Sequence, residues 1–267
     1  MMTQALSLPP SPKTNADARR TLWNHFILAR ALGRLARITA TQATESAIPF
    51  CYVDTHAGIG RVQRPQAYLE QLFAQRQHFT GDDYFVGLTP GLANDQHPGS
   101  WVLAGRVINA AGGESLVVEI DVNDIDPALV SQARGNREGT WVRFWSQDWF
   151  SFLRSHLSLT APPNFVFIDP PPGDARGPGY AIDAALLLET LKVPYMISYL
   201  ADNPQEPIDD IGRPGLELVC EDGDAGVLLG GGGESLLLDI LPDLRRLAAV
   251  LGGNFHTRLP RHDDYSI

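Results

Sequence analysis

The residues best suited to chemistry in this chain are an acid and two prolines, Asp169, Pro170 and Pro171. They follow the apolar run FVFI at 165–168, which is typical of a buried strand. The prolines restrict the backbone to an extended loop, which leaves the Asp169 carboxylate and the Pro170 carbonyl free to accept hydrogen bonds. These two acceptors, here called the clamp, could hold both protons of an exocyclic amine and aim its nitrogen lone pair at a methyl donor. The structural alternative is a proline-rich stop after a strand.

A second group of candidates follows the apolar run 48–53. Asp54 comes directly after that run, and Gly58 and Gly60 stand one residue apart shortly beyond it. Glycines permit backbone angles closed to other residues, so a ligand could approach the bare backbone of this turn. His56 could face a ligand carboxylate or simply satisfy the turn. A Gly-x-Gly turn alone is a weak indication of a ligand site.

Two further acids are expected at strand ends. Glu119 closes the apolar run 115–118, and a carboxylate there could accept both hydroxyl protons of a cofactor ribose. Asp148 follows the run 141–145 and could accept a hydrogen bond from an adenine amino group, with Trp149 or Phe150 covering the ring. The structural alternatives are helix caps, above all an N-cap at Asp148.

Several classes of protein have little support in the sequence. A dinucleotide-binding fingerprint would need a third glycine where Gln63 stands, and its acid would lie much closer than Glu119. No Lys-Ser or Lys-Thr follows the glycines at 230–233, as a P-loop requires. No nucleophile is paired with a recognisable base, and no His or Cys spacing resembles a zinc site, so no metal is predicted.

The elements around these candidates alternate between strands and helices. Strands are expected at 48–53, 115–119, 141–145, 165–168, 195–200, 216–221 and 226–229, and helices at 17–38, 66–79, 100–111, 127–133, 150–157, 182–191 and 234–251. Continuous apolar strands that alternate with helices predict an α/β fold, a mostly parallel seven-stranded sheet with helices on both faces. Ligands of such sheets bind outside the carboxyl ends of the strands, where the acids and glycines fall.

The chain of 267 residues, 44% hydrophobic and 19% charged, predicts one main domain. We expect a flexible lead at 1–16 and a domain at 17–267, with an insertion at about 62–99 after the first strand. The two cysteines, Cys51 and Cys220, suit free thiols in a reducing compartment. No stretch near the start suits a signal peptide or a membrane helix, and a cytoplasmic location is expected.

The charge is unevenly distributed along the chain. The formal net charge is -10, yet the first forty residues hold six basic residues against one acid, Asp17, and so carry +5, which leaves -15 for the rest. The acidic total argues against a protein that grips a polyphosphate over most of its surface. The arginines from Arg19 to Arg37 could instead contact RNA locally, or form a solvated helix face.

These motifs resemble those of class I S-adenosylmethionine-dependent methyltransferases, and more closely the family that methylates the N6 amine of an adenine in large-subunit ribosomal RNA. The Asp-Thr-His-Ala-Gly turn is intact at 54–58, and the catalytic Asp-Pro-Pro is similar to residues 169–171. The resemblance spans about 15–251 and implies a Rossmann-like methyltransferase fold with S-adenosyl-L-methionine as cofactor. It implies a catalytic role for Asp169 and cofactor contacts from the following residues: His56, Ser100, Glu119, Asp148 and Trp149.

The chain departs from this family in three ways, the first being a Pro- and Ser-containing lead in place of the basic, aromatic start that helps to grip RNA. Pro172 stands where the family has an aromatic residue that stacks on the target base, and Thr21 stands where it has a cofactor-contacting histidine. Trp149, Tyr180 or Tyr199 could supply the missing stacking surface. Two alternatives therefore stay open beside RNA methylation: a small molecule or protein as methyl acceptor, and a catalytically inactive binding protein on the same scaffold.

Overall fold

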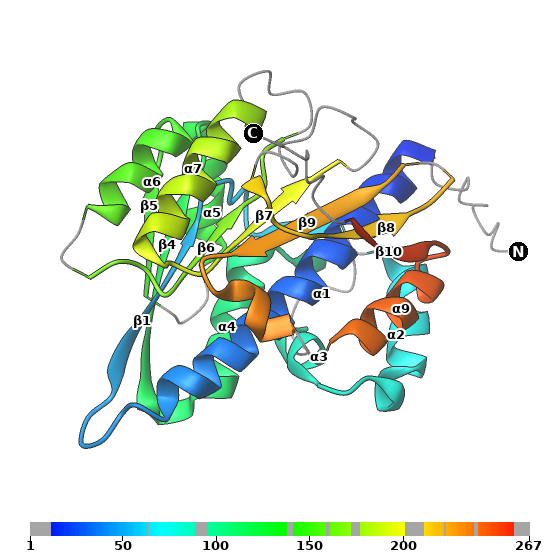
Figure 1. Ribbon diagram of the computed structural model, residues 1–267, viewed down its shortest axis with the longest axis horizontal. Helices are drawn as coiled ribbons and strands as arrows, with labels where there is room; N and C mark the ends of the chain where they lie inside the picture. Colours follow the sequence, from blue (N-terminus) through cyan, green and yellow to red (C-terminus); the bar gives the residue numbers. More distant parts are fainter. Residues whose placement is uncertain are drawn as a thin grey trace, which may run out of the picture.

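The computed structural model describes residues 12–63, 65–88, 96–137, 141–158, 161–171, 177–200, 211–221, 223–237 and 240–258. A mixed sheet of eight strands forms its centre (Figure 1). The order of these strands across the sheet is β10 (Asn254–Arg258), β8 (Gly215–Val219), β9 (Ala225–Gly230), β7 (Tyr195–Tyr199), β6 (Phe165–Ile168), β1 (Ile48–Asp54), β4 (Leu116–Asn123) and β5 (Trp141–Trp145).

Five strands run parallel and three are joined to them by antiparallel pairing. β5, β4, β1, β6 and β7 pair in parallel, whereas β9 is antiparallel to both β7 and β8. β10 then pairs antiparallel with β8. The mostly parallel α/β sheet is as predicted, but the predicted count of seven strands is wrong. β10 was missed because its exposed, mixed sequence NFHTR lacks the apolar run of the inner strands.

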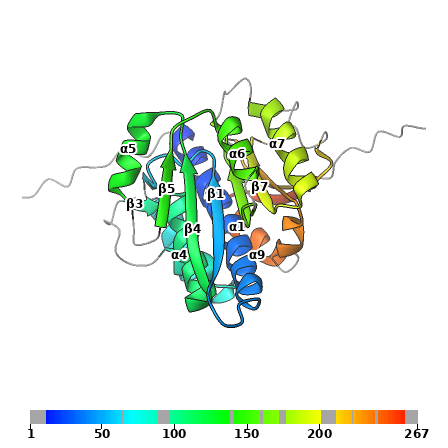
Figure 2. The same cartoon turned by 90° about the vertical axis from the view of Figure 1, so that its left-hand side faces the viewer.

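Helices cover both faces of the sheet (Figure 2). One face carries α6 (Trp149–Leu157) and α7 (Gly177–Leu191), which pack over Val53, Val166 and Ile197. The other face carries α1 (Pro12–Ala40), α4 (Ser100–Gly112) and α9 (Leu241–Val250). α5 (Pro127–Gly135) connects β4 to β5. This arrangement leaves the strand ends, and the loops after them, as the places where ligands can reach the backbone.

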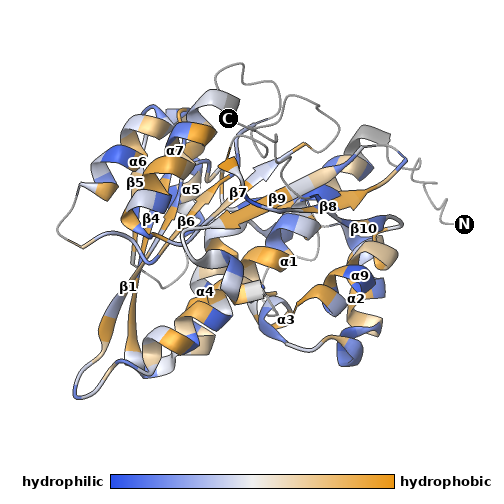
Figure 3. Ribbon diagram, viewed as in Figure 1, coloured by the Kyte–Doolittle hydropathy of each residue, from blue (hydrophilic) through white to orange (hydrophobic). Residues whose placement is uncertain are grey.

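The first helix, α1, lies at the centre of the molecule. Trp23, Phe26, Ile27, Leu28 and Ala29 are all fully buried, although these residues point to different sides of the helix. A stretch of helix that is buried all round must be covered on all sides. The sheet, α4 and the segment between β1 and α4 supply this cover. The neighbouring β9 is coloured as hydrophobic along much of its length (Figure 3).

The segment between β1 and α4 folds as a small helical unit. It contains β2 (Arg61–Gln63), α2 (Gln66–Ala74), a 3-10 turn at Arg76–His78, α3 (Asp83–Gly87) and β3 (Gln96–Pro98). β2 and β3 pair antiparallel, so the unit begins and ends side by side. Phe79 and Tyr84 pack on Phe26 of α1, with ring centroids 5.3 and 5.4 Å away.

Two expectations near the ends of the chain differ from the structure. Residues 12–16 belong to α1 rather than to a flexible lead, and residues 1–11 lie outside the described part. The last helix was predicted from 234, but a 3-10 turn at Gly233–Leu237 precedes α9, which begins at Leu241. Pro242 suits the first turn of a helix and not its interior, which explains the later start.

Candidate functional site

The candidate residues gather where the strand order reverses. β1 lies between β4 and β6, and all three are parallel, so their carboxyl ends open at one edge. Residues 54, 122 and 167 lie at the same level in this part of the sheet, because Asp54 is in register with both Val122 and Phe167. Such a reversal is where doubly wound sheets leave a crevice for ligands. The loops after Asp54, Asn123 and Ile168 therefore lie together at the edge where such a crevice is expected.

Asp54 is the buried anchor of the loop after β1. Its carboxylate accepts hydrogen bonds from Ser100 Oγ at 2.5 Å, Tyr52 Oη at 3.1 Å and the His56 backbone N–H at 3.2 Å. Burial raises the pKa of Asp54 to about 7, and these hydrogen bonds partly oppose the rise. Asp54 and Ser100 thus bind each other and tie the start of α4 to the end of β1.

The two glycines of this loop differ in their surroundings. Both have positive φ, +53° at Gly58 and +74° at Gly60. A Cβ at Gly58 would meet no atom within 4 Å, whereas a Cβ at Gly60 would overlap the Trp101 ring. The Gly60 carbonyl also accepts from the Gly99 N–H at 2.7 Å. Gly60 is therefore required by packing, and Gly58 is the glycine with open space beside it.

Glu119 does not lie at the end of a strand, which corrects the prediction. β4 continues for four residues beyond it to Asn123, roughly 13 Å at the rise of a strand. Glu119 lies level with Cys51, and its nearest charged partner is Arg143, whose Nη2 is 3.4 Å from its carboxylate. The strand was ended too early because Glu119 and Asp121 interrupt the apolar run. The alternation of Ile120 and Val122 with those acids was the missed signal.

The residues that do stand at the end of β4 are Asn123 and Asp124. The Asn123 side chain donates to the Thr55 carbonyl at 3.3 Å and the Gln147 carbonyl at 3.0 Å, and it accepts from the Gln147 N–H. It thereby links the loops after β1, β4 and β5. Asp124 accepts from the Gly58 N–H at 3.1 Å, so a carboxylate that sequence reasoning missed lies against the glycine turn.

The predicted residues after β5 serve the fold in ways that sequence alone left open. Asp148 is the N-cap of α6 and accepts from the Ser151 N–H at 2.9 Å. Trp149 is 7% exposed, and its ring lies 5.3 Å from that of His56. The Trp149 indole N–H is buried and has no hydrogen-bond partner in the described part of the chain. It is one of several such buried atoms in the described residues, and its place beside His56 makes it a position where an acceptor could bind.

The two predicted tyrosines have different environments. Tyr180 is half-buried in the first turns of α7 and stacks on Phe150, with centroids 5.1 Å apart and planes 6° apart. Its ring also meets Trp149 edge to face at 5.9 Å. Tyr199 is buried, and its hydroxyl donates to Glu217 at 3.0 Å. Tyr180 therefore joins an aromatic cluster beside Trp149, whereas Tyr199 is held inside the sheet. Pro172 lies outside the described residues, and Pro171 is exposed.

The clamp is formed at the end of β6 and is closed by residues that sequence reasoning did not assign to it. Arg20 Nη2 donates to Asp169 Oδ1 at 2.5 Å, to the Pro170 carbonyl at 3.3 Å and to Ser198 Oγ at 2.9 Å. The Ser198 hydroxyl, on β7, donates a short hydrogen bond to the same Asp169 oxygen. The Asp169 carboxylate and the Pro170 carbonyl thus converge on a single nitrogen. The basic run in α1 included Arg20, but its contact spans 149 residues and had no local signal.

Other arginines of α1 are also directed into the fold. Arg37 pairs with Asp83 through two nitrogens at 2.6 and 3.0 Å. Arg30 donates to Thr80 at 3.1 Å and lies 3.6 Å from Asp243, and Arg19 donates to the Tyr68 hydroxyl at 2.9 Å. The positive charge predicted from the sequence is therefore largely matched by acids and hydroxyls of this chain.

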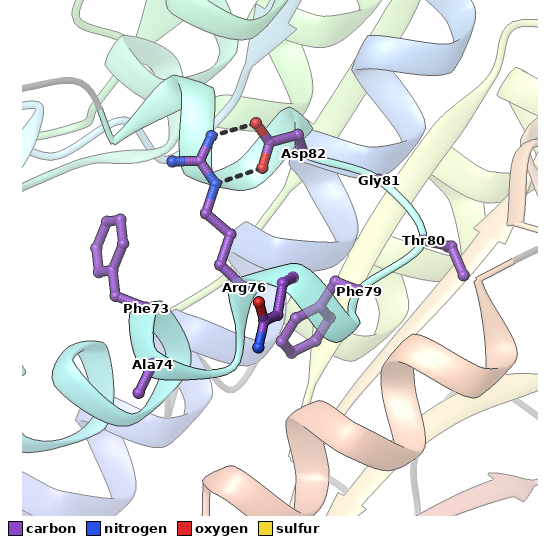
Figure 4. A pocket seen from close by; sticks show the side chains of 8 residues that line it. Phe73, Ala74, Arg76, Phe79, Thr80, Gly81 and Asp82 are labelled. Carbon is purple, nitrogen blue, oxygen red and sulfur yellow. Dashed lines mark hydrogen bonds and ion pairs between the residues drawn. The ribbon is translucent and has the colours of Figure 1, made fainter.

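A separate groove lies on the helical unit between β1 and α4. It has a volume of about 530 Å³ and is lined by Phe73, Phe79, Thr80 and the ion pair of Arg76 with Asp82 (Figure 4). It contains none of the strand-end residues. Across the described residues, no helix combines the length and apolar character needed to cross a membrane.

No protein-family model matches this chain, and no curated protein matches its sequence. Among solved structures, protein LPL1258 of the DUF519 family from Legionella pneumophila is similar, with a TM-score of 0.62 at 15% identity over 92% of this chain and 98% of that one. A candidate class I S-adenosylmethionine-dependent methyltransferase from Listeria monocytogenes matches with a TM-score of 0.43 at 11% identity, over 91% and 74%. The candidate methyltransferase yhhF from Escherichia coli matches with a TM-score of 0.33 at 14% identity, over 73% and 85%. The last two scores are too low to support an argument, so the comparisons establish an α/β fold shared with LPL1258.

Proposed function

We propose that this protein transfers a methyl group from S-adenosyl-L-methionine to an exocyclic amine. One observation supports this most directly: the Asp169 carboxylate and the Pro170 carbonyl both reach one nitrogen, that of Arg20, at 2.5 and 3.3 Å. An acceptor amine in that position would donate its two protons to the same two oxygens. Its lone pair would then leave conjugation and point away from the clamp, toward the methyl donor.

The crevice between β1, β4 and β6 offers groups that fit the cofactor. Gly58 has open space beside it, and Asp124 keeps lone pairs for ribose hydroxyls while accepting from the Gly58 N–H. The buried indole N–H of Trp149 lacks an acceptor in the described residues. We propose that Gly58, Asp124, His56 and Trp149 hold the cofactor, and that Asp54 and Ser100 position the loop. When bound, the cofactor would supply an electrophilic methyl group and leave as S-adenosylhomocysteine, and the methylated nitrogen would lose one proton to solvent.

The acceptor we favour is an adenine in ribosomal RNA, following the resemblance of residues 54–58 and 169–171 to that family. Tyr180 is the candidate for covering the base, because its ring belongs to the aromatic cluster with Phe150 and Trp149. The clamp itself does not distinguish adenine from another planar amine. RNA contact through α1 is part of this proposal.

A small-molecule acceptor is the second candidate. It is favoured by the pairing of Arg30 and Arg37 with Asp243 and Asp83, which reduces the positive charge that α1 can offer to phosphates. A catalytically inactive binding protein is favoured by Arg20, because its guanidinium occupies the clamp.

The test begins with titration of S-adenosylhomocysteine into the purified protein by calorimetry. Transfer of a labelled methyl group is then measured to a short adenine-containing RNA, to adenosine and to small amines. Asp169→Ala should reduce transfer at least about 100-fold, because it removes a preorganised acceptor, and leave cofactor affinity within about twofold. Asp126→Asn, at the exposed N-cap of α5, is the control and should keep full activity. Absence of cofactor binding, or full activity of Asp169→Ala, would refute the proposal.

A further inference from the structure

Arg20 meets the Asp169 carboxylate through a single nitrogen, as Arg30 and Arg258 meet Asp243 and Glu217. Four other pairs in the described part of the chain use two nitrogens of the guanidinium on two carboxylate oxygens: Arg37 with Asp83, Arg76 with Asp82, Arg143 with Asp121 and Arg213 with Glu189. Among the described residues, Arg20 reaches Asp169 through Nη2 alone, at Oδ1. Two parallel hydrogen bonds give such pairs their strength and orientation. The contact of Arg20 with the clamp lacks the second bond.

The rest of the Arg20 guanidinium is poorly satisfied in this position. Its Nε is buried and has no hydrogen-bond partner among the described residues. The side chain is 15% exposed, so water compensates only in part. A buried donor without a partner costs free energy that a different position of the side chain could recover.

A second position for the guanidinium lies beside the clamp. A cavity of about 170 Å³ is lined by Asp17, Arg19 and Arg20 of α1, Leu200 after β7, Leu218 of β8 and Asp224 of the β8–β9 turn, so its two acids face two arginines. Asp17 precedes Arg20 by three residues on α1, a spacing at which side chains meet on one helix face. Asp224 uses Oδ1 to accept from the Cys220 N–H at 2.8 Å, and its Oδ2 accepts no hydrogen bond from the described residues. In Figure 1 the start of α1 lies near this turn.

We propose that Arg20 is an exchangeable occupant of the clamp, which moves between Asp169 and the acidic pair Asp17 and Asp224. The inference rests on the proposed function, since it concerns how the acceptor amine gains access. While Arg20 Nη2 is bound, both clamp oxygens are taken and a positive charge stands where the methylated nitrogen would become positive. An acceptor amine can bind only after Arg20 has moved to the acidic pair. Arg20 is thus a gating residue for the acceptor.

Methylguanidine can test this exchange without knowledge of the acceptor, because its NH₂ group can occupy the same oxygens as Arg20. Its binding would be followed by calorimetry and by NMR shifts in the full chain. Arg20→Met keeps an unbranched apolar stem and removes the competing guanidinium, so methylguanidine should bind at least about tenfold more tightly than to the natural chain. Arg20→Lys should fall between the two. Arg37→Ala, on the same helix but paired with Asp83, is the control and should match the natural chain.

The second position is tested by neutralising both acids. Asp17→Asn with Asp224→Asn should hold Arg20 in the clamp and weaken methylguanidine binding about threefold. The same double change in the Arg20→Met background should have no effect, which removes any general influence of the lost charges. Equal affinity of Arg20→Met and the natural chain, or an equal effect of the acids in both backgrounds, would overturn the exchange. Failure to bind S-adenosylhomocysteine would instead reject the methyltransferase proposal and leave this ranking of affinities interpretable.

Discussion

Two acids on neighbouring parts of the sheet show how differently a carboxylate can be held in this protein. Asp121, inside β4, is fully buried and meets Arg143 through two nitrogens, Trp145 Nε1 at 3.3 Å and His156 Nε2 at 3.5 Å. Asp169, beyond β6, has 32% of its side chain exposed and meets one nitrogen of Arg20. Asp121 is surrounded by donors that complete its coordination, whereas Asp169 shares one oxygen between Arg20 and Ser198.

The surroundings of Asp121 also shift the pKa values of Asp121 itself and of a neighbouring cysteine. Burial alone would raise the pKa of Asp121, but hydrogen bonds from His156, Arg143 and Trp145 outweigh it and hold the pKa below its usual value. The pKa of the nearby Cys51 thiol is raised to about 12 by burial and by Asp121, so this cysteine stays protonated. The Asp121 cluster is therefore a closed structural unit. Two of the buried polar atoms that have no hydrogen-bond partner among the described residues, Arg20 Nε and Trp149 Nε1, belong instead to residues near the carboxyl edge.

The largest expected effect is the difference in unfolding free energy between variants of Asp121 and of Asp169. Asp121→Asn should lower the free energy of unfolding by about 3 kcal/mol, because Arg143 loses its buried counter-charge. Asp169→Asn should cost about 1 kcal/mol or less, since its pair is partly exposed and singly bonded. Urea unfolding of both variants makes the comparison. Equal losses would show that the two acids do not differ in the way their contacts indicate.

The two glycines of the loop after β1 should also differ in how much stability the protein loses when each is replaced. Gly60→Ala should cost about 2–3 kcal/mol, from overlap with Trp101 and from its positive φ. Gly58→Ala carries only the backbone cost, about 1 kcal/mol, because no atom opposes its Cβ. Thermal unfolding with calorimetry measures both. If Gly58→Ala were the more damaging change, the assignment of Gly60 to packing would fail.

Asp54 lies at the carboxyl edge of the sheet but is buried. A pH series can show whether burial or its hydrogen bonds decide its protonation. Its folded pKa, about 7, is above the value of an unfolded aspartate, so its contribution to stability is fully present near pH 4 and is lost as the pH rises through 7. Relative to Asp54→Asn, the natural chain should lose about 1 kcal/mol of unfolding free energy per pH unit in that window. Urea unfolding at several pH values tests this. A constant difference would indicate that the hydrogen bonds from Ser100, Tyr52 and His56 keep Asp54 ionised.

The smallest expected effect tests whether the geometry of an ion pair or its burial determines how much it contributes to stability. Arg37 and Asp83 share the two-nitrogen geometry of the Asp121 pair, but the Arg37 side chain is 52% exposed. Arg37→Gln should therefore cost only about 0.5 kcal/mol, since solvent screens the charges. Chemical unfolding at low and high salt would measure it. A loss as large as that of Asp121→Asn would mean that geometry alone sets the strength of these pairs.

Sequence reasoning predicted two strands to the residue because apolar and aromatic side chains dominate them. The predicted bounds 141–145 and 165–168 are those observed for β5 and β6. It was less successful where tertiary contacts decide. β4 continues past Glu119 because Arg143 on the next strand neutralises Asp121, and β10 forms only because β8 offers an edge.

The candidate site followed the same rule. Local motifs identified Asp54, Gly58 and Asp169, since each stands directly after an apolar run. Arg20 and Ser198 reach Asp169 from α1 and β7, so no spacing along the chain could indicate them. The alternation through Ile120 and Val122, followed to the end of the strand, would have indicated Asp124 as a strand-end acid.

The hydrogen bond from Gly99 to Gly60 has a consequence for how this chain could be altered. The two ends of the helical unit between β1 and α4 meet there, so a short linker could replace residues 61–98 without stretching the backbone. The buried rings argue against such a shortened form, because removing Phe79 and Tyr84 would leave Phe26 of α1 facing water. The unit could be removed without breaking the path of the backbone, but its removal would expose apolar surface on α1. A truncated protein would need a new apolar cover for its first helix before it could be isolated as a monomer.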